Sequence, residues 1–421
     1  MNRVSALLIA GLAAACAEGS PAPAPANRAP AAAAGPDLTA DEGATIAISG
    51  AASVDPDGAL TAFEWVQTGG SPVVLRNATG ATAVFDAPLV AADATLRFRL
   101  TVTDNDGATA SDEIDVTVRR AAPGEIVEAR MTYAGEERAY LVYTPASYAP
   151  GGPAVLLLHG GGRSMRLVLN AESTTQRWLT LADSEGFLLV APNGFNEALG
   201  DGLGDAQSWN DLRDDDTGRT SNEDDVGFVM AALDAVRAAR GHDPDRVFAT
   251  GASNGGMMSM RLLIERGADF AGAAAFIAAL PQETVQDPLA PKPIMLLNGD
   301  QDAAVLFGGG PVADGGAPTR SVPDTVDYFT RVTGADVTGA VTRLLPDAAP
   351  DDKCRIIETS YPSTTGGAPP VVFYLAQGGG HNIPDPMAAP LPPAAGTVLG
   401  NRCRDAHGVD LAYDFFTRLL N

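Results

Sequence analysis

A serine at position 253 stands among small residues, in the segment Gly251-Ala252-Ser253-Asn254-Gly255. The preceding RVFAT is typical of a buried strand, and the following MMSMRLLIER is typical of a helix. A sharp strand–turn–helix connection of this kind exposes a serine hydroxyl for attack on a carbonyl carbon, and flanking glycines let the two elements approach closely. The segment therefore predicts a nucleophilic Ser253, although a glycine-rich loop that caps a helix would look similar.

A nucleophilic serine needs a base that accepts its proton and an acid that orients the base. Only two of the four histidines, His381 and His407, follow Ser253. His381 lies in the glycine-rich YLAQGGGHNIP after a predicted strand, so we expect its ring to reach the serine. His407 precedes the last predicted helix, and we interpret it as a surface or capping residue.

The acid is expected between the serine and the histidine, because α/β-hydrolases use the chain order serine, acid, histidine. The segment PIMLLNGDQDAAV supplies Asp300 and Asp302 directly after a predicted strand. The layout Gly299-x-x-Asp302-x-x-Val305 resembles the one common in this superfamily. We predict that Asp302 orients His381 and that Asp300 is a turn residue.

A second glycine-rich turn follows the predicted strand AVLLLHG. Backbone N–H groups of Gly161 and Asn254 would face the substrate carbonyl oxygen there and form an oxyanion hole. His159 is interpreted as a structural residue of this turn, because it precedes the expected acid in the chain. His242 is interpreted as a loop residue that leads into the strand before Ser253.

Strands alternate with helices over residues 124–421, which predicts a mostly parallel sheet covered on both faces, the α/β class. The expected strands are AVLLLHG, GFLLVAPNG, RVFATGAS, GAAAFIAAL, PIMLLNGD and PVVFYLAQGG. The expected helices are STTQRWLTLADSE, VGFVMAALDAVRAARG, GMMSMRLLIERGA and DLAYDFFTRLLN.

Residues 37–120 have a different sequence pattern, in which short runs of alternating apolar and polar residues, typical of strands, are separated by the turns DPDG and DNDG. This pattern predicts a small all-β sandwich. The segments DEGATIAISGAASVDPDGALTAFEWVQT and RLTVTDNDGATASDEIDVTV resemble PKD-like, immunoglobulin-like domains, and Trp65 matches a buried core tryptophan of that fold. The turn aspartates have two interpretations, tight turns or a calcium site: Asp55, Asp57, Asp104 and Asp106.

The N-terminal residues 1–20 are expected to be an export signal, with Arg3 before a short apolar stretch. The segment ends in LAAAC, which resembles a lipoprotein cleavage site with Cys16 as the lipidated residue, although Ala13 replaces the favoured leucine. Plain removal by signal peptidase is the alternative. The Pro/Ala-rich residues 21–36 are expected to be an extended linker.

Two cysteines remain, Cys354 and Cys403, and an oxidising compartment favours a disulfide between them over two free thiols. The net charge of −24 over 421 residues argues against nucleic acid and anionic membrane as partners, because both are polyanions.

The segment from Arg138 to Pro384 resembles the secreted polyhydroxybutyrate depolymerase and feruloyl esterase family, which includes carbohydrate esterase family one. The matching segments are LLLHGGGRS, WLTLADSEGFLLVAPNG, SWNDL, DDVGFVMAALDAV, DPDRVFATGASNGGMMS, LNGDQDAAV and GGGHNIP. The resemblance implies a serine ester hydrolase with no metal and no organic cofactor. It implies a polyester or a feruloylated polysaccharide as substrate, with the sandwich as spacer or polymer-docking module.

Two residues depart from the family pattern at the expected rim of the site: Ile383 replaces a tryptophan, and Gly161 replaces a cysteine of depolymerase-like members. The acidic residues 201–225 are expected to be a solvated loop, with a lid or a calcium loop as alternatives, and Asp225 is expected to cap the next helix. Two other functions stay open: a small-ester or peptide hydrolase of the same fold, and a catalytically inactive adhesion lipoprotein.

Overall fold

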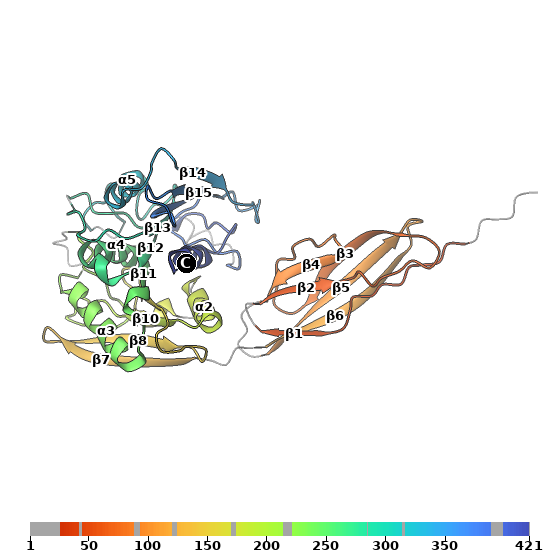
Figure 1. Cartoon of the computed structure of the whole chain (residues 1–421), viewed down its shortest axis with the longest axis horizontal. Helices are drawn as coiled ribbons and strands as arrows, with labels where there is room; N and C mark the ends of the chain where they lie inside the picture. The colour runs from red at the N-terminus through yellow and green to blue at the C-terminus, as the bar shows by residue number, and fades with distance from the viewer. Residues whose placement is uncertain are drawn as a thin grey trace, which may run out of the picture. The chain divides into compact units, whose positions relative to one another are not determined.

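The computed structural model describes residues 26–41, 44–87, 93–119, 124–169, 174–213, 221–283, 285–313, 316–388 and 399–420. The chain divides into two compact units, Met1–Arg119 and Arg120–Asn421, shown in Figure 1. The expected signal segment and Cys16 lie outside the described residues. In the described part of the chain, no helix combines the length and apolar composition that a membrane crossing requires.

The first unit is the expected β-sandwich. One sheet has the order β1-β6-β5-β3 and the other pairs β2 with β4. The strands are β1 (Leu38–Asp41), β2 (Thr45–Ser49), β3 (Leu60–Gly69), β4 (Thr82–Asp86), β5 (Ala94–Asp104) and β6 (Thr109–Arg119). Alternate residues of β5 enter the core, and Trp65 is only 2% exposed, which confirms the expected core tryptophan.

The sandwich begins earlier in the chain than expected. The backbone of Ala31 exchanges two hydrogen bonds with Val54, at 2.8 and 3.0 Å. Ala34 is fully buried in the core, and its N–H donates to Asp112 Oδ2 at 2.8 Å. These residues lie in the segment expected to be a linker, so the ordered domain includes the C-terminal end of that segment.

The turn aspartates of the sandwich bind backbone. Asp104 Oδ1 accepts hydrogen bonds from the N–H groups of Asp106 and Ala108, at 2.9 and 2.8 Å. Asp55 Oδ1 accepts from Asp57 N–H at 3.4 Å. Among the described residues, no three acidic, histidine or cysteine side chains are grouped to hold a metal ion. The tight-turn interpretation is therefore the one that the contacts support.

The second unit, called the α/β unit below, contains one ten-stranded sheet of order β14-β15-β16-β13-β12-β11-β9-β10-β8-β7. The six strands from β10 to β16 in this order are parallel, and antiparallel strands flank them on both sides. The bounds are β7 (Glu125–Tyr133), β8 (Glu136–Thr144), β9 (Ala154–Leu158), β10 (Leu188–Pro192), β11 (Val247–Ala252), β12 (Gly272–Phe276), β13 (Ile294–Gly299), β14 (Val341–Leu344), β15 (Arg355–Tyr361) and β16 (Val371–Gln377).

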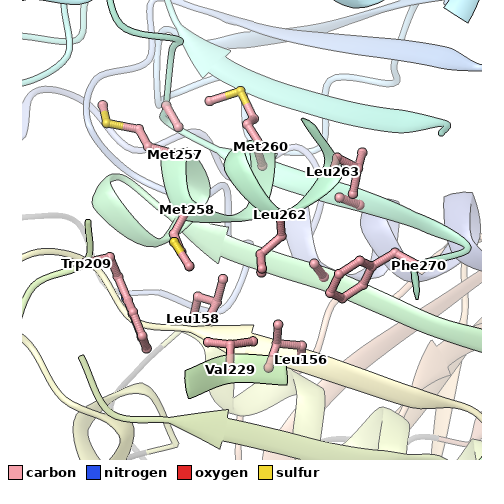
Figure 2. Packing of buried hydrophobic residues seen from close by; sticks show 14 of the residues in the cluster. Leu156, Leu158, Trp209, Val229, Met257, Met258, Met260, Leu262, Leu263 and Phe270 are labelled. Carbon is pink, nitrogen blue, oxygen red and sulfur yellow. The ribbon is translucent and has the colours of Figure 1, made fainter. Parts of the chain in front are cut away.

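Helices cover both faces of this sheet. They are α1 (Met165–Val168), α2 (Arg177–Glu185), α3 (Asp225–Arg240), α4 (Asn254–Arg266), α5 (Val322–Thr333) and α7 (Gly408–Leu420). Leu156 and Leu158 of β9 pack in one cluster with α3, α4 and α5, as Figure 2 shows in part. Val155 and Leu157 pack in the other cluster, with α2 and α7. The expected α/β-hydrolase fold is confirmed.

All six expected strands and four expected helices of the α/β unit are present. Four strands and one long helix were not expected: β7, β8, β14, β15 and α5. The 3-10 turns are Thr174–Gln176, Pro244–Arg246 and Gly267–Asp269.

Candidate active site

Ser253 lies at the junction of β11 and α4, where the chain reverses sharply. Its backbone has φ 56° and ψ −125°, a sparsely populated conformation for a non-glycine residue. A Cβ on Gly251 would lie 2.5 Å from the backbone of Gly255, and one on Gly255 would lie 2.3 Å from Leu158 O. The backbone around Ser253 is therefore packed too closely to admit a side chain at Gly251 or Gly255.

His381 and Asp302 come from the loops after the neighbouring parallel strands β16 and β13. His381 Nδ1 lies 2.8 Å from Asp302 Oδ2, and the Asp302 side chain is 1% exposed. Asp302 Oδ1 accepts the N–H groups of Ala304 and Val305, both at 2.8 Å. These two N–H groups fix the carboxylate with Oδ2 toward the histidine. Nδ1 of His381 therefore donates to Oδ2, and Nε2 stays available as a base.

Ser253 and His381 line the same cavity, which has a volume of about 620 Å³. Its other walls combine polar and apolar side chains with the glycine turn after β9: Gly161, Gly162, Phe195, Asn196, Glu197, Ala198, Ala206, Ser208, Arg213, Met257, Ala304, Val305, Val312, Ala313 and Leu399. The structure therefore brings the predicted serine and histidine to one cavity of ligand size.

The two predicted oxyanion donors lie close together beside this cavity. A Cβ built on Gly161 would lie 3.5 Å from the Cβ of Asn254. Asn254 is the first residue of α4, so its N–H has no intrahelical acceptor and points along the positive end of the helix dipole. Within the described ranges, no acceptor is bound to the N–H of Gly161 or of Asn254.

The SWNDL segment holds Asn254 in place. Asn254 Oδ1 accepts from Trp209 N–H at 2.7 Å, and Asn254 Nδ2 donates to Asp211 Oδ2 at 2.7 Å. Asp211 pairs with Arg213 at 2.9 Å, and both side chains are at most 1% exposed. This role of Asp211 could not be predicted from the sequence, because nothing in the local spacing links Asp211 to a residue 43 positions later.

His159 holds the glycine turn after β9 in place, which is the structural role that its position suggested. It is buried, with Nε2 accepting from Gly194 N–H at 2.9 Å and Nδ1 2.9 Å from Gly160 O. Trp209 Nε1 donates to His159 O at 2.9 Å. Burial lowers the pKa of His159 to about 4, so the ring is neutral and links the turn to its neighbours.

Of the remaining two histidines, His242 is buried and His407 is partly buried. His242 Nε2 is 3.2 Å from Leu233 O, in the loop before β11. His407, expected to be a surface or capping residue, is partly buried, with a side chain 13% exposed and Nε2 3.8 Å from Asp385 Oδ1. Its C=O accepts Leu411 N–H at 3.2 Å directly before α7, which is the capping position. Burial lowers the pKa of His407. Asp300, expected in a turn, accepts Gly378 N–H at 2.7 Å and so braces the loop that carries His381.

Two expectations for residues 201–225 are corrected. Asp224, not Asp225, caps α3, because its side chain accepts Gly227 N–H at 2.9 Å. Asp225 is fully buried and pairs with Arg138 at 2.5 Å. Asp211 is buried too, so the segment is not a simple solvated loop; residues 214–220 lie outside the described part.

Cys354 and Cys403 form a disulfide, with Cα atoms 5.3 Å apart. Of the two departures from the family pattern, Gly161 lies at the cavity, whereas Ile383 is 7% exposed and packs in the core with α7. The expectation that Ile383 lies at the rim is therefore wrong.

Two similarities to known proteins identify the family of the chain and its N-terminal domain. Residues 34–118 match a family model described as a PKD domain. Over 322 residues the chain is 31% identical to the protein named "Putative esterase NocK" of Nocardia uniformis subsp. tsuyamanensis, covering 73% of this chain and 88% of that relative. The chain belongs to this esterase family. It is a carboxylic ester hydrolase with the α/β-hydrolase fold and an N-terminal PKD-like domain.

Two further similarities are to proteins that are also named as esterases. The chain is 34% identical over 137 residues to Feruloyl esterase C of Emericella nidulans, covering 32% of this chain and 43% of that protein. A solved acetyl xylan esterase from Aspergillus awamori superposes on 69% of this chain and 99% of its own, with 14% identity and a TM-score of 0.43.

Proposed function

We propose that this esterase works by a serine mechanism, with Ser253 as nucleophile, His381 as general base and Asp302 as the orienting acid. The observation that carries the proposal is the 2.8 Å contact between His381 Nδ1 and Asp302 Oδ2 beside a cavity that Ser253 also lines. The strained backbone of Ser253 supports it, because such conformations cluster at functional sites.

In the proposed reaction, His381 Nε2 takes the hydroxyl proton as Ser253 Oγ bonds to the ester carbonyl carbon. The N–H groups of Gly161 and Asn254 stabilise the oxyanion, and the carbonyl reforms as the alcohol leaves with the proton from His381. Water, deprotonated by His381, then hydrolyses the acyl-enzyme and releases the acid. The residues assigned need no metal ion or organic cofactor for any of these steps.

For the substrate we propose a polyester of the polyhydroxybutyrate type or a feruloylated polysaccharide, acted on after export from the cell. The mixed polar and apolar cavity wall suits an ester with an apolar acyl group and a hydroxylated partner. The buried disulfide supports export, because such bonds persist in oxidising compartments. Lipidation of Cys16 remains part of this proposal, with the sandwich and linker as a spacer.

The spacer role is preferred to polymer docking for a physical reason. Docking on polysaccharide or polyester surfaces favours exposed aromatic rings. In the described part of the sandwich, the exposed large apolar side chains are valines: Val54, Val66 and Val74. The aromatic residues of the sandwich, such as Trp65, Phe85 and Phe98, fill its core.

The test is a hydrolysis panel of p-nitrophenyl butyrate, methyl ferulate and a polyhydroxybutyrate suspension, each with and without a serine-directed phosphonate. We expect Ser253→Ala to lower kcat at least about 1,000-fold and to abolish phosphonate labelling. Ser259→Ala is the matched control, since this hydroxyl of α4 only donates to Gly255 O. Unchanged turnover by Ser253→Ala would refute the serine assignment.

The panel also separates the substrates. Phosphonate-sensitive clearing of the suspension identifies a depolymerase. Cleavage of methyl ferulate with no clearing identifies a feruloyl esterase, and cleavage of p-nitrophenyl butyrate alone identifies a small-ester hydrolase. Absence of turnover on all three substrates would favour an inactive adhesion lipoprotein.

A further inference from the structure

The loop that carries His381 rests on a second segment, residues 399–404, which we call the strap. His381 N–H donates to Leu399 O at 2.6 Å. Gly380 N–H donates to Asn401 O at 2.7 Å, and Asp385 N–H donates to Cys403 O at 2.9 Å. The position of the His381 backbone therefore depends on the position of the strap.

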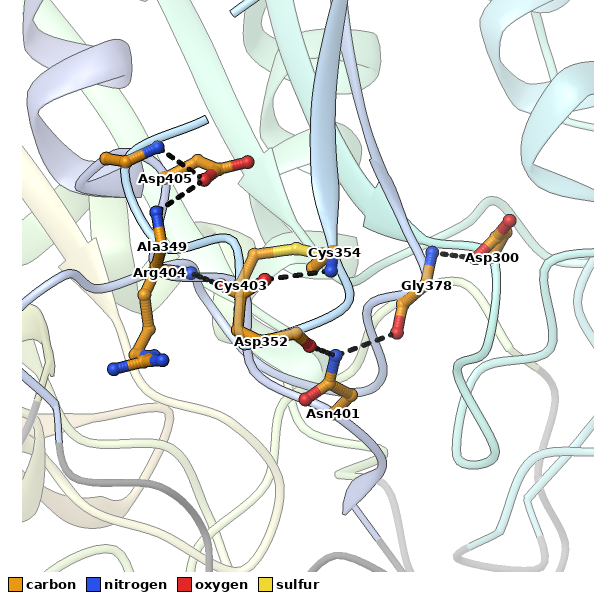
Figure 3. Close-up of a disulfide and its surroundings, with 10 residues drawn as sticks. Asp300, Ala349, Asp352, Cys354, Gly378, Asn401, Cys403, Arg404 and Asp405 are labelled. Carbon is orange, nitrogen blue, oxygen red and sulfur yellow. Dashed lines mark hydrogen bonds between the residues drawn. A yellow bond between two sulfur atoms is a disulfide. The ribbon is translucent and has the colours of Figure 1, made fainter. Parts of the chain in front are cut away.

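The strap is fastened at Cys403 to Cys354, just before β15. Both cysteines are 2% exposed and pack within the core of the α/β unit. Asp352 spans the crosslink, because its Oδ1 accepts Cys354 N–H at 2.8 Å and its Oδ2 accepts Arg404 N–H at 2.7 Å. Figure 3 shows the disulfide with these contacts.

Asn401 joins the fastened end of the strap to the His381 loop. Its Nδ2 donates to Asp352 O at 2.5 Å and to Gly378 O at 3.3 Å, both drawn in Figure 3. The main chains also touch: a Cβ on Gly380 would lie 2.3 Å from Leu399 O. The strap and the loop are in such close contact that one cannot shift without moving the other.

We propose that the Cys354–Cys403 disulfide and Asn401 are positioning residues for His381. They act on the base through the strap and contact no substrate. The inference rests on the proposed function, because it requires His381 to be the general base. A displacement of about 1 Å of a catalytic group lowers turnover about 100-fold in well-oriented sites, whereas binding of a small ester at the cavity is largely unaffected.

The experiment compares Cys354→Ala/Cys403→Ala and Asn401→Ala with wild type on p-nitrophenyl butyrate. Circular dichroism first fixes a temperature at which every variant is folded. We expect kcat to fall about 10- to 100-fold in the cysteine variant and by a smaller factor in Asn401→Ala, with KM within about twofold of wild type. Val236→Ala, a core truncation in α3 outside the strap and the cavity lining, is the control for destabilisation alone.

Adding Asn401→Ala to the cysteine variant tests whether both act through the strap. We expect the combined loss of kcat to be smaller than the product of the separate losses. Wild-type kcat in the folded cysteine variant and in Asn401→Ala would overturn the proposal. If the cysteine variant does not fold, Asn401→Ala alone decides it.

Ser253→Ala distinguishes failure of the positioning role from failure of the proposed serine mechanism. Loss of activity in Ser253→Ala with unchanged kcat in the strap variants removes only the positioning role. Wild-type activity in Ser253→Ala removes the serine mechanism itself and this inference with it.

Discussion

In the sandwich, ion pairs lie across the outer face of one sheet. Arg97 contacts Asp115 at 2.7 Å and Arg99 contacts Glu113 at 2.8 Å, and each arginine side chain is 52% exposed. In the α/β unit, Arg138 contacts Asp225 at 2.5 Å with both side chains at most 1% exposed. The same chemical pair is therefore solvated in one unit and sequestered in the other.

The buried pairs join segments that build the site. Arg138 of β8 donates to Asn193 O at 3.2 Å, and Asp225 Oδ2 accepts Asn210 N–H at 2.8 Å. A lone buried charge is strongly unfavourable, so such a pair allows few other arrangements of the backbone around it. The exposed pairs of the sandwich can rearrange in water at little cost. Burial rather than pairing therefore decides whether a charged side chain fixes the local backbone geometry in this protein.

The largest effect is expected at Asp302, the buried acid beside His381. In Asp302→Asn, the amide oxygen still accepts the N–H groups of Ala304 and Val305, so the amide NH₂ must face His381 Nδ1. Nδ1 then becomes an acceptor and Nε2 carries the proton, which removes the proposed base. We expect kcat/KM to fall about 10,000-fold. Asp115→Asn in the sandwich is the matched control and should leave esterase kinetics unchanged.

Breaking the buried pair should strongly destabilise the α/β unit. Arg138→Met leaves Asp225 buried without its partner, and we expect a loss of about 3–5 kcal/mol in the free energy of unfolding. Urea denaturation followed by circular dichroism measures it. Arg97→Met in the sandwich should lower stability by less than about 1 kcal/mol. Equal losses in the free energy of unfolding of the two variants would show that burial does not make the Arg138–Asp225 pair more important for stability than the exposed pair.

Acid should destabilise the α/β unit more than the sandwich, because the two histidines whose pKa burial lowers, His159 and His407, lie in the α/β unit. Burial lowers the pKa of His159 to about 4, below its value of about 6.5 in the unfolded chain. The unfolded state therefore binds the proton first as pH falls, and stability is lost between about pH 6.5 and 4. From pH 7 to 5 we expect a loss of about 2 kcal/mol from this residue.

Calorimetry at several pH values, with the unfolding transitions of the two units separated, measures how the free energy of unfolding of each unit changes with pH. His159→Gln should weaken the pH dependence of the α/β unit's stability. The side-chain amide oxygen of glutamine can still accept Gly194 N–H but does not titrate in this range. A slope of equal size in the sandwich transition would contradict the assignment to histidine.

The smallest effect concerns the exposed pair Arg99–Glu113. A double-mutant cycle with Arg99→Ala and Glu113→Ala should give a coupling of about 0.2–1 kcal/mol that disappears in 1 M salt. A coupling above about 2 kcal/mol would show that a solvated pair also fixes geometry.

Much of this site could be predicted, because its parts are local in sequence. The glycines around Ser253 and the loops after two strands carry their own signals, and they predict the order serine, acid, histidine. The partners of Asp211 and Asp225 could not be predicted. Arg138 precedes Asp225 by 87 residues, and an acidic segment looks solvated until the fold brings its partner to it.

The unexpected helix α5 carries start signals in its own sequence. Ser321 caps it, accepting Asp324 N–H at 3.0 Å, with a proline in the first turn. The hairpin of β7 and β8 is different, since β8 pairs with β10 some 50 residues later and gains its burial only there. Strand pairing at that distance is a property of the assembled sheet, not of the segment.

The backbone of Ser253 also has a consequence for selection. Only glycine adopts positive φ readily, so serine at φ 56° is held there by the surrounding strand and helix at a penalty of about 1–3 kcal/mol. Ser253→Gly should therefore unfold at a higher temperature than wild type while losing the proposed nucleophile. A screen of variants for heat resistance alone would enrich that inert form, so engineering of this enzyme must select on hydrolysis and heat resistance together.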